Sequence, residues 1–186
     1  MKRLPFIRDN LIDFVKQTVG KQDLSIGEIG VYRGKYTEVY INRATTSRVY
    51  LIDIWETSNH DGYISGMGPG DIENGYKEVQ EIYGVLPNVT LCKGFSTEWS
   101  QKFNDEFFDW VYLDADHSYQ SVLNDIKHWY PKVKKGGIIS GHDFLPNPNH
   151  DISYFGVDKA VCEFFNPNDI FLTNEEYYKS WVYIKN

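Results

Sequence analysis

"DLSIGEIGVYRGKYT", residues 23–37, joins an apolar segment to a helical pattern through a glycine-rich turn. The apolar part predicts a buried strand, and Gly27, Gly30 and Gly34 mark the junction. Glycine is used where a backbone turns sharply or approaches another group closely. Because ligands of open α/β sheets bind beyond the carboxyl ends of the strands, the turn predicts a ligand at this strand end.

Short apolar runs alternate with helical patterns along the rest of the chain. The predicted strands are 24–30, 49–54, 89–93, 110–114, 137–141, 170–173 and 180–184. The predicted helices are 5–19, 36–45, 71–84, 97–104, 119–131 and 156–165. This alternation indicates an α/β fold with a parallel sheet covered on both faces. No helix separates the last two strands, so the last strand is expected to be antiparallel.

The overall composition is that of a globular protein and disfavours nucleic-acid-binding and membrane-spanning proteins. The chain has 186 residues, is 41% hydrophobic and has a formal net charge of −7, which is typical of a globular protein. A nucleic-acid partner is disfavoured because no basic face is evident, and no stretch approaches membrane-spanning length. We therefore expect a single domain over residues 1–186, located in the cytoplasm, with neither a nucleic-acid nor a membrane partner. A homo-oligomer is compatible with the sequence.

A second acidic position suggests the kind of ligand. Asp53 ends the next predicted strand, in "VYLIDIWE", and a carboxylate there can accept both hydroxyls of a ribose. Together with Glu28 it suits a ligand that carries an amine and a ribose, which describes S-adenosylmethionine better than NAD. The spacing G-x-x-G-x-x-x-G also departs from the dinucleotide fingerprint, which weighs against an NAD-linked oxidoreductase.

These features, with "FDWVYLDADHSYQSVLNDIKHWYPKVKKGGIISGHDF" at 108–144, resemble a class I S-adenosylmethionine-dependent methyltransferase over about residues 24–165. The chain is similar to the O-methyltransferase branch, which includes catechol-type and macrolide-sugar enzymes. The resemblance implies a Rossmann-like, mostly parallel sheet of seven strands, with helices on both faces and an antiparallel last strand. It also implies S-adenosylmethionine as the cofactor.

The resemblance also carries cofactor-binding roles onto this chain. The positions that would line the methionine portion are Glu28, Gly30 and Tyr32, with Thr37 near its carboxylate. Those that would hold the ribose and flank or border the adenine are Asp53, Ile54, Trp55, Gly94, Phe95 and Ser96, and Asp114 would lie at the mouth of the site. Packing alone is the alternative explanation for Gly30 and Gly34, and helix capping is the alternative for Asp53.

Four further side chains follow two adjacent predicted strands. "LDADHSY" and "SGHDF" bring Asp114, His117, His142 and Asp143 to the cofactor mouth, and we predict that they are catalytic. In the resemblance, Asp114, His142 and Asp143 take the positions of metal ligands and His117 that of the base. An imidazole ligand suits manganese better than magnesium, although the family also contains metal-independent members. As a base, His117 would need no unusual pKa, because an imidazole titrates near neutral pH.

The expected function is O-methylation of a small polyhydroxylated acceptor, a sugar or glycan. Two long polar loops, 55–70 and 144–156, are predicted to be lids over the site. Their aromatic residues Tyr63, Tyr154 and Phe155 could stack on a sugar face. A phenol or catechol-type acceptor is the alternative, and a nucleoside-binding module without catalysis is a further one.

Overall fold

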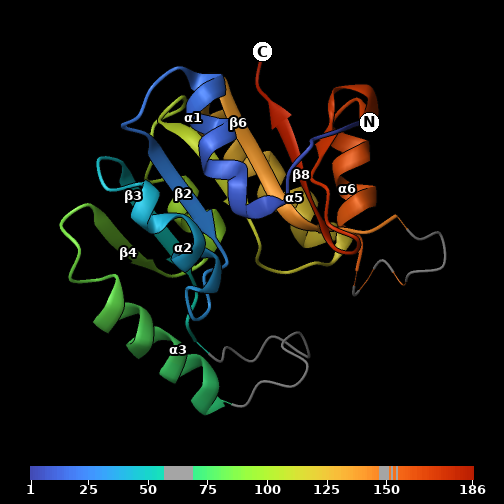
Figure 1. Cartoon of the computed structure of the whole chain (residues 1–186). Helices are drawn as coiled ribbons and strands as arrows, with labels where there is room; N and C mark the ends of the chain where they lie inside the picture. Colours follow the sequence, from blue (N-terminus) through green and yellow to red (C-terminus); the bar gives the residue numbers. More distant parts are fainter. Residues whose placement is uncertain (57–68, 147–150, 152, 154) are drawn as a thin grey trace.

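The computed structural model describes residues 1–56, 69–146, 151, 153 and 155–186. Their centre is a sheet of eight strands in the order β1-β7-β8-β6-β5-β2-β3-β4 (Figure 1). The strands are β1 (Lys2–Arg3), β2 (Ser25–Ile29), β3 (Arg48–Asp53), β4 (Val89–Lys93), β5 (Phe108–Leu113), β6 (Val133–Phe144), β7 (Phe171–Leu172) and β8 (Lys179–Ile184). The helices are α1 (Leu11–Val19), α2 (Lys35–Tyr40), α3 (Pro69–Ile82), α4 (Ser96–Ser100), α5 (Tyr119–Trp129) and α6 (Val157–Phe164).

The sheet is mostly parallel. Strands β2, β3, β4, β5 and β6 pair in parallel, whereas β8 is antiparallel to both β6 and β7. The predicted fold class is therefore confirmed, including the antiparallel last strand. One strand was not predicted: β1 has only two residues and pairs with β7, and such a short segment has no periodic pattern to detect.

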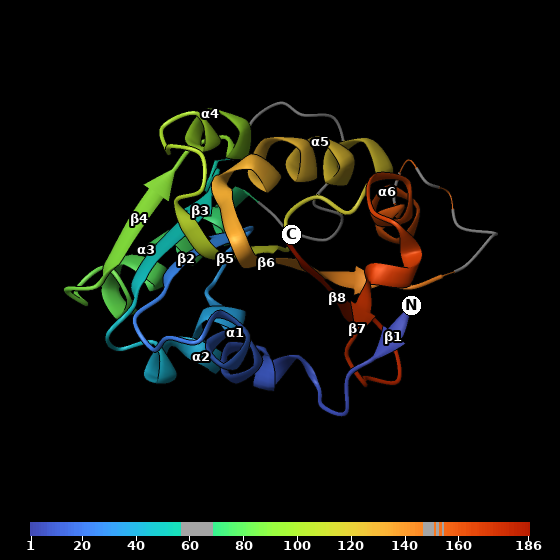
Figure 2. The same cartoon turned by 90° about the horizontal axis from the view of Figure 1, so that it is seen from above.

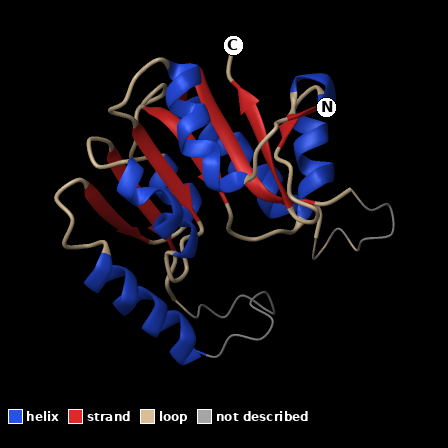
Figure 3. Ribbon diagram, viewed as in Figure 1, coloured by secondary structure: helices blue, strands red, loops and turns tan. Residues whose placement is uncertain are grey.

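Helices cover both faces of the sheet (Figures 2 and 3). Alternate residues of each strand enter different cores, because successive strand side chains point to opposite faces. Trp110 and Tyr112 of β5 pack with α1 and α2, whereas Val111 and Leu113 pack with α5 and α6. The buried sheet leaves its strand ends as the place where polar side chains can gather.

Most predicted elements lie within a few residues of the observed ones. The largest boundary shifts are at α1, which begins at Leu11 instead of residue 5, and at α2, which ends at Tyr40 instead of residue 45. Strand β6 begins at Val133 instead of residue 137, because the polar "KKGG" that follows Val133 belongs to the strand. Most of the first predicted lid loop, 55–70, and part of the second, 144–156, lie outside the described residues. Within the described part of the chain, no helix has the length and apolar character needed to cross a bilayer.

Candidate functional site

The glycine turn after β2 is shaped by the chain itself. Gly30 has φ +88°, and a Cβ there would lie 2.1 Å from the carbonyl oxygen of Asp114. Gly34 has φ +71°, and its Cβ would lie 2.4 Å from the ring of Tyr83. Side chains are excluded from both positions by protein atoms. Packing therefore explains why both positions are glycine, and the role of Gly30 beside the methionine portion stays a prediction.

Glu28 lies one strand position before this turn and is buried. Its Oε2 accepts hydrogen bonds from Thr37 Oγ1 at 2.8 Å and from Tyr40 Oη at 2.6 Å. Burial raises the pKa of Glu28 to about 8, although these two hydrogen bonds oppose the shift. Thr37 is fully buried, and its hydroxyl is engaged in the hydrogen bond that it donates to Glu28.

Asp53, at the end of β3, fastens the glycine turn. Its Oδ2 accepts the backbone N–H groups of Val31 and Tyr32, each at 2.8 Å, and its Oδ1 accepts that of Trp55 at 2.9 Å. An ionised carboxylate has about four acceptor positions. Three are used, so this conformation leaves Asp53 room for about one ribose hydroxyl rather than for both.

The other predicted adenosine-binding residues surround this turn with differing exposure. Trp55 is 1% exposed, and its indole donates to the carbonyl oxygen of Tyr32 at 2.8 Å. Ile54 is half-buried, whereas Phe95 is 41% exposed. Ser96 lies deeper, where its hydroxyl donates to Asp125 at 2.6 Å. Ile54 and Phe95 are thus the more accessible apolar surfaces for an adenine.

Gly94 precedes these residues at the end of β4. It has φ +141°, and its N–H donates to the carbonyl oxygen of Asp53 at 2.9 Å. The turn after β4 is therefore tied to the end of β3. This connection holds the two predicted halves of an adenosine site next to each other.

The predicted catalytic residues gather at the carboxyl ends of β5 and β6. Asp114, His117 and Asp143 each offer one donor atom, and these three atoms lie within 4.8 Å of one another. His117 Nε2 is 2.9 Å from Asp143 Oδ2 and 3.7 Å from Asp114 Oδ1. Nε2 is buried, yet among the described residues no acceptor meets hydrogen-bond geometry with it.

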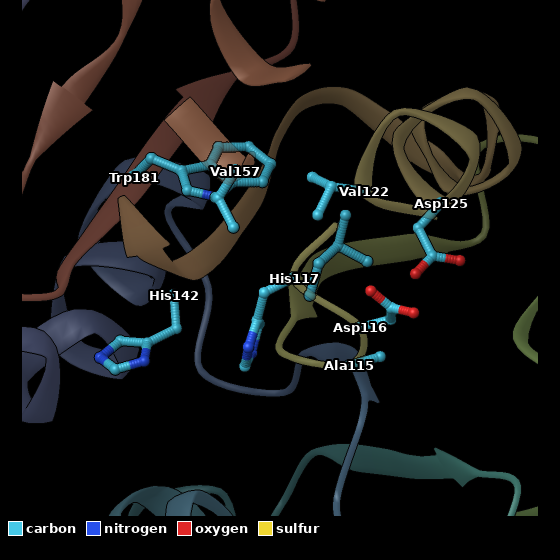
Figure 4. A pocket seen from close by; sticks show the side chains of 9 residues that line it. Ala115, Asp116, His117, Val122, Asp125, His142, Val157 and Trp181 are labelled. Atoms are coloured by element: carbon cyan, nitrogen blue, oxygen red, sulfur yellow. The ribbon is translucent and has the colours of Figure 1, made fainter. Parts of the chain in front are cut away.

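His142 flanks this cluster. Its Nδ1 lies 3.2 Å from Asp143 Oδ1 and 3.9 Å from Asp114 Oδ1. Figure 4 shows the His117 ring between His142 on one side and Asp116 on the other. All four predicted catalytic residues are therefore close together. The structure groups His117, instead of the predicted His142, with the two carboxylates as a three-donor set.

The carboxylates and imidazoles in this cluster shift the pKa values of His117 and Asp143. Burial favours the neutral imidazole, but the adjacent carboxylates of Asp114 and Asp143 outweigh it and raise the pKa of His117 to about 10. Burial would raise the pKa of Asp143, whereas His117 and His142 hold it well below its usual range. The expectation that His117 titrates near neutral pH is not met, because two carboxylates stabilise its charged form.

Local backbone features aim these side chains. Ser118 caps the N-terminus of α5, with its hydroxyl 3.4 Å from the N–H of Ser121, and this cap fixes His117 immediately before the helix. Asp143 has φ +58°, and the pairing of β6 with β8 is irregular between Gly141 and Phe144. The irregular strand end lets Asp143 reach His117.

Two contributors to the site were not predicted from the sequence. Arg8 lies 3.7 Å from Asp114 Oδ2, although it is 106 residues away in the chain. Tyr178, in the turn between β7 and β8, packs against Phe155, which in turn lies 5.8 Å from the His117 ring. No motif marks either residue; the aromatic pair "YY" at 177–178 was the available signal for Tyr178.

Comparison with known families matches the segment that carries these strand ends. Residues 28–144 match a family model described as "Methyltransferase domain". The matched segment runs from Glu28 to Phe144 and therefore contains both the glycine turn and the acidic cluster. No curated protein matches the chain.

Solved structures share the fold at low sequence identity. Spermidine synthase from Thermotoga maritima superposes with a TM-score of 0.60 and 15% identity, covering 98% of this chain and 60% of that chain. A Staphylococcus aureus protein provisionally named a caffeoyl-CoA O-methyltransferase gives 0.64 and 14%, covering 98% and 86%. An O-methyltransferase family protein from Burkholderia thailandensis gives 0.63 and 11%, covering 95% and 55%. The chain thus spans less than two thirds of the synthase.

Proposed function

The chain belongs to the methyltransferase-domain family, and from this premise we propose that it is an S-adenosylmethionine-dependent O-methyltransferase. Its proposed acceptor is a hydroxyl group of a small polyhydroxylated molecule, a sugar or glycan. The observation that carries the proposal is the cluster of Asp114, His117 and Asp143, whose donor atoms lie within 4.8 Å of one another at the strand ends.

The cluster suits an acceptor hydroxyl. Methyl transfer to oxygen requires the hydroxyl to be aligned with the methyl donor and to lose its proton. Asp114 and Asp143 supply acceptor oxygens, and His117 Nε2 lies 2.9 Å from Asp143 Oδ2. Because the pKa of His117 is raised to about 10, only its minor neutral form could accept a proton at neutral pH. These side chains would therefore orient the hydroxyl and take up its proton, while S-adenosylmethionine supplies the methyl group.

A divalent metal fits the same residues. Two carboxylates and one imidazole form a common donor set for such ions. The buried Nε2 of His117, which lacks a directed hydrogen bond, is an atom that a metal would satisfy. Asp114, His117 and Asp143 would hold the ion, with His142 beside them, and when bound it would lower the pKa of a coordinated hydroxyl.

Metal binding can be measured without turnover. We expect calorimetry on chelator-treated protein to detect binding of Mn²⁺ at least as tight as that of Mg²⁺, because an imidazole ligand favours the softer ion. Asp143→Asn should weaken binding, whereas Asp105→Asn, which alters an exposed residue paired with Lys132, should not. Absence of binding by the wild-type protein would leave a metal-free cluster as the proton-transfer group.

Aromatic side chains support the choice of a polyhydroxylated acceptor. Phe155 lies beside His117, and its partner Tyr178 is 48% exposed. Such rings offer an apolar face on which a sugar ring can stack while the cluster binds its hydroxyls. Tyr63 and Tyr154, predicted for the same purpose, lie outside the described residues.

Transfer of an isotopically labelled methyl group tests the proposed reaction. The protein would be incubated with labelled S-adenosylmethionine and a panel of sugars, glycans and catechols. We expect label in a sugar or glycan, and loss of transfer in Asp114→Asn but not in Asp105→Asn. If only catechols acquire the label, the acceptor is a catechol instead of a sugar or glycan. Cofactor binding without transfer to any compound would favour a nucleoside-binding module.

A further inference from the structure

Thr37, the residue predicted to lie near the carboxylate of S-adenosylmethionine, forms its hydrogen bond with another residue. Its side chain is fully buried and its hydroxyl donates to Glu28. The neighbouring carboxylates of Asp53 and Asp114 would repel a ligand carboxylate. A cation at this strand end would offset that repulsion and bind the carboxylate of a zwitterionic methionine group.

Arg8 supplies a cation at this position. Its guanidinium lies over the ring of Tyr36, 5.0 Å from the ring centroid, and Tyr36 immediately precedes Thr37 in α2. Arg8 Nη1 lies 3.7 Å from Asp114 Oδ2, which is too long for a hydrogen bond. The side chain is 28% exposed. Arg8 is thus held beside Asp114 with donor positions left for a ligand.

The segment that carries Arg8 is fixed at several points. The Arg8 backbone N–H donates to Glu175 Oε1, and the Arg8 carbonyl oxygen accepts from the Tyr36 hydroxyl at 3.3 Å. Two residues earlier, the Phe6 carbonyl oxygen accepts from the N–H of Asn174 at 2.9 Å. These contacts tie the segment both to α2 and to the turn between β7 and β8. The guanidinium is therefore positioned before a ligand arrives.

We propose that Arg8 binds the α-carboxylate of the methionine portion of S-adenosylmethionine. An arginine fork can hold a carboxylate through two parallel hydrogen bonds. Two further cations lie near the glycine turn. Arg33 is paired with Asp71 and Glu78 at 3.5 and 2.6 Å, and Lys35 is 81% exposed and lies 4.0 Å from Glu38. The inference rests on the proposed use of S-adenosylmethionine. It adds a residue from outside the matched family segment, which begins at Glu28.

Decarboxylated S-adenosylmethionine isolates this contact, because it lacks only the carboxylate. We expect the wild-type protein to bind S-adenosylmethionine more tightly than the decarboxylated compound in calorimetry. Arg8→Met should weaken binding of S-adenosylmethionine roughly 10–150-fold, the effect of a hydrogen bond to a charged group. It should leave binding of the decarboxylated compound unchanged. Arg8→Lys should be intermediate, because lysine keeps the charge but loses the fork.

A matched control is Arg43→Met, which removes an arginine that is paired with Asp13 at 2.7 Å on the α1 side of the molecule. It should alter binding of neither compound. If Arg8→Met does not fold, the Arg8→Lys variant and the wild-type preference between the two compounds still decide the matter.

Three results would overturn the proposal. Equal wild-type affinity for the two compounds would mean that the carboxylate is not recognised. An equal loss of both affinities in Arg8→Met would give Arg8 a packing role. Unchanged cofactor affinity with a raised KM for the acceptor would assign Arg8 to the acceptor instead. Because the measurement is of binding, a failure of the proposed methyl transfer would appear separately, in the label-transfer assay.

Discussion

Gly30 and Asp114 meet so closely that a Cβ on the glycine would lie 2.1 Å from the aspartate's carbonyl oxygen. This contact joins the glycine turn to the cluster of Asp114, His117 and Asp143. The proposed cofactor-binding and catalytic parts of the site therefore pack directly against each other, and we expect a displacement of the turn to shift the strand end that carries Asp114.

Gly30→Ala is expected to destabilise the protein by about 2–5 kcal/mol. The positive φ costs about 1–2 kcal/mol for a residue with a Cβ, and displacement of packed backbone adds about 1–3 kcal/mol. Urea unfolding measures the difference. The control is Gly20→Ala, with φ +76° and nothing within 4 Å of its Cβ, which should lose only the backbone contribution. Equal losses in the two variants would show that the contact with Asp114 is unimportant.

Asp125→Asn is expected to change how stability depends on pH. Burial raises the pKa of Asp125 to about 6, although the hydrogen bond from Ser96 opposes the shift. From about pH 4 to 6 the unfolded chain releases this proton while the folded chain keeps it, so stability falls as pH rises. The full effect is about 3 kcal/mol. Because asparagine does not ionise, the variant should lack this decline and be the more stable form at pH 7.

Asp109→Asn is expected to change the pH dependence of stability in the opposite direction to Asp125→Asn. Although burial opposes it, hydrogen bonds from Lys134, the Ser25 backbone and Lys21 lower the pKa of Asp109. The ionised Asp109 carboxylate stabilises the folded protein at pH values above its pKa in the unfolded chain. This stabilisation is lost as the pH falls through the lower pKa that Asp109 has in the folded protein. The variant should therefore be less stable than the wild type at pH 7, with the gap closing in acid. Urea unfolding of both variants and the wild type from about pH 2 to pH 7 covers both pKa ranges. A stability difference from the wild type that does not change with pH in either variant would contradict the assignment for that residue.

Asp53→Ala is expected to weaken S-adenosylmethionine binding by about 1.5–3 kcal/mol, the range for hydrogen bonds to charged groups. The variant frees the N–H groups of Val31 and Tyr32, so the glycine turn should also loosen. Calorimetry measures the affinity, and Glu56→Ala, which removes an exposed neighbour paired with Lys93 at 3.6 Å, is the control. A folded Asp53→Ala protein with unchanged affinity would remove Asp53 from the site.

The fold could be predicted from the sequence because apolar periodicity reports directly on burial. The acidic residues at strand ends were predictable for the same reason, since a strand's end places its side chains at the sheet's edge. The partners that these residues choose were not predictable. Asp53 accepts hydrogen bonds from backbone N–H groups, and the Thr37 hydroxyl donates a hydrogen bond to Glu28. Both contacts depend on the exact path of the glycine turn.

It was harder still to predict from the sequence which residues form the proposed catalytic cluster. Along a regular strand, His142 and Asp143 would point to opposite faces. The irregular pairing between Gly141 and Phe144 and the positive φ of Asp143 bring that side chain to His117 instead. Arg8 arrives from a segment far away in sequence that carries no motif, so nothing local indicates its proximity to Asp114.

His117→Ala is expected to lower kcat by about 10²–10⁴-fold, the usual contribution of a general acid or base. Because the pKa of His117 is raised to about 10, the neutral imidazole becomes more abundant as the pH rises above neutrality. The wild-type rate should therefore rise with pH in this range, and the variant should lack this rise. Affinity for S-adenosylmethionine should hardly change, because the imidazole faces Asp143 and Asp114 rather than the glycine turn. Steady-state kinetics with calorimetry separates the two effects. His128→Ala is the control, since that ring contacts the Asn124 carbonyl oxygen of its own helix at 2.8 Å. Wild-type kcat in His117→Ala would reduce His117 to a residue at a helix start, and the proton acceptor would have to be Asp114, His142 or Asp143.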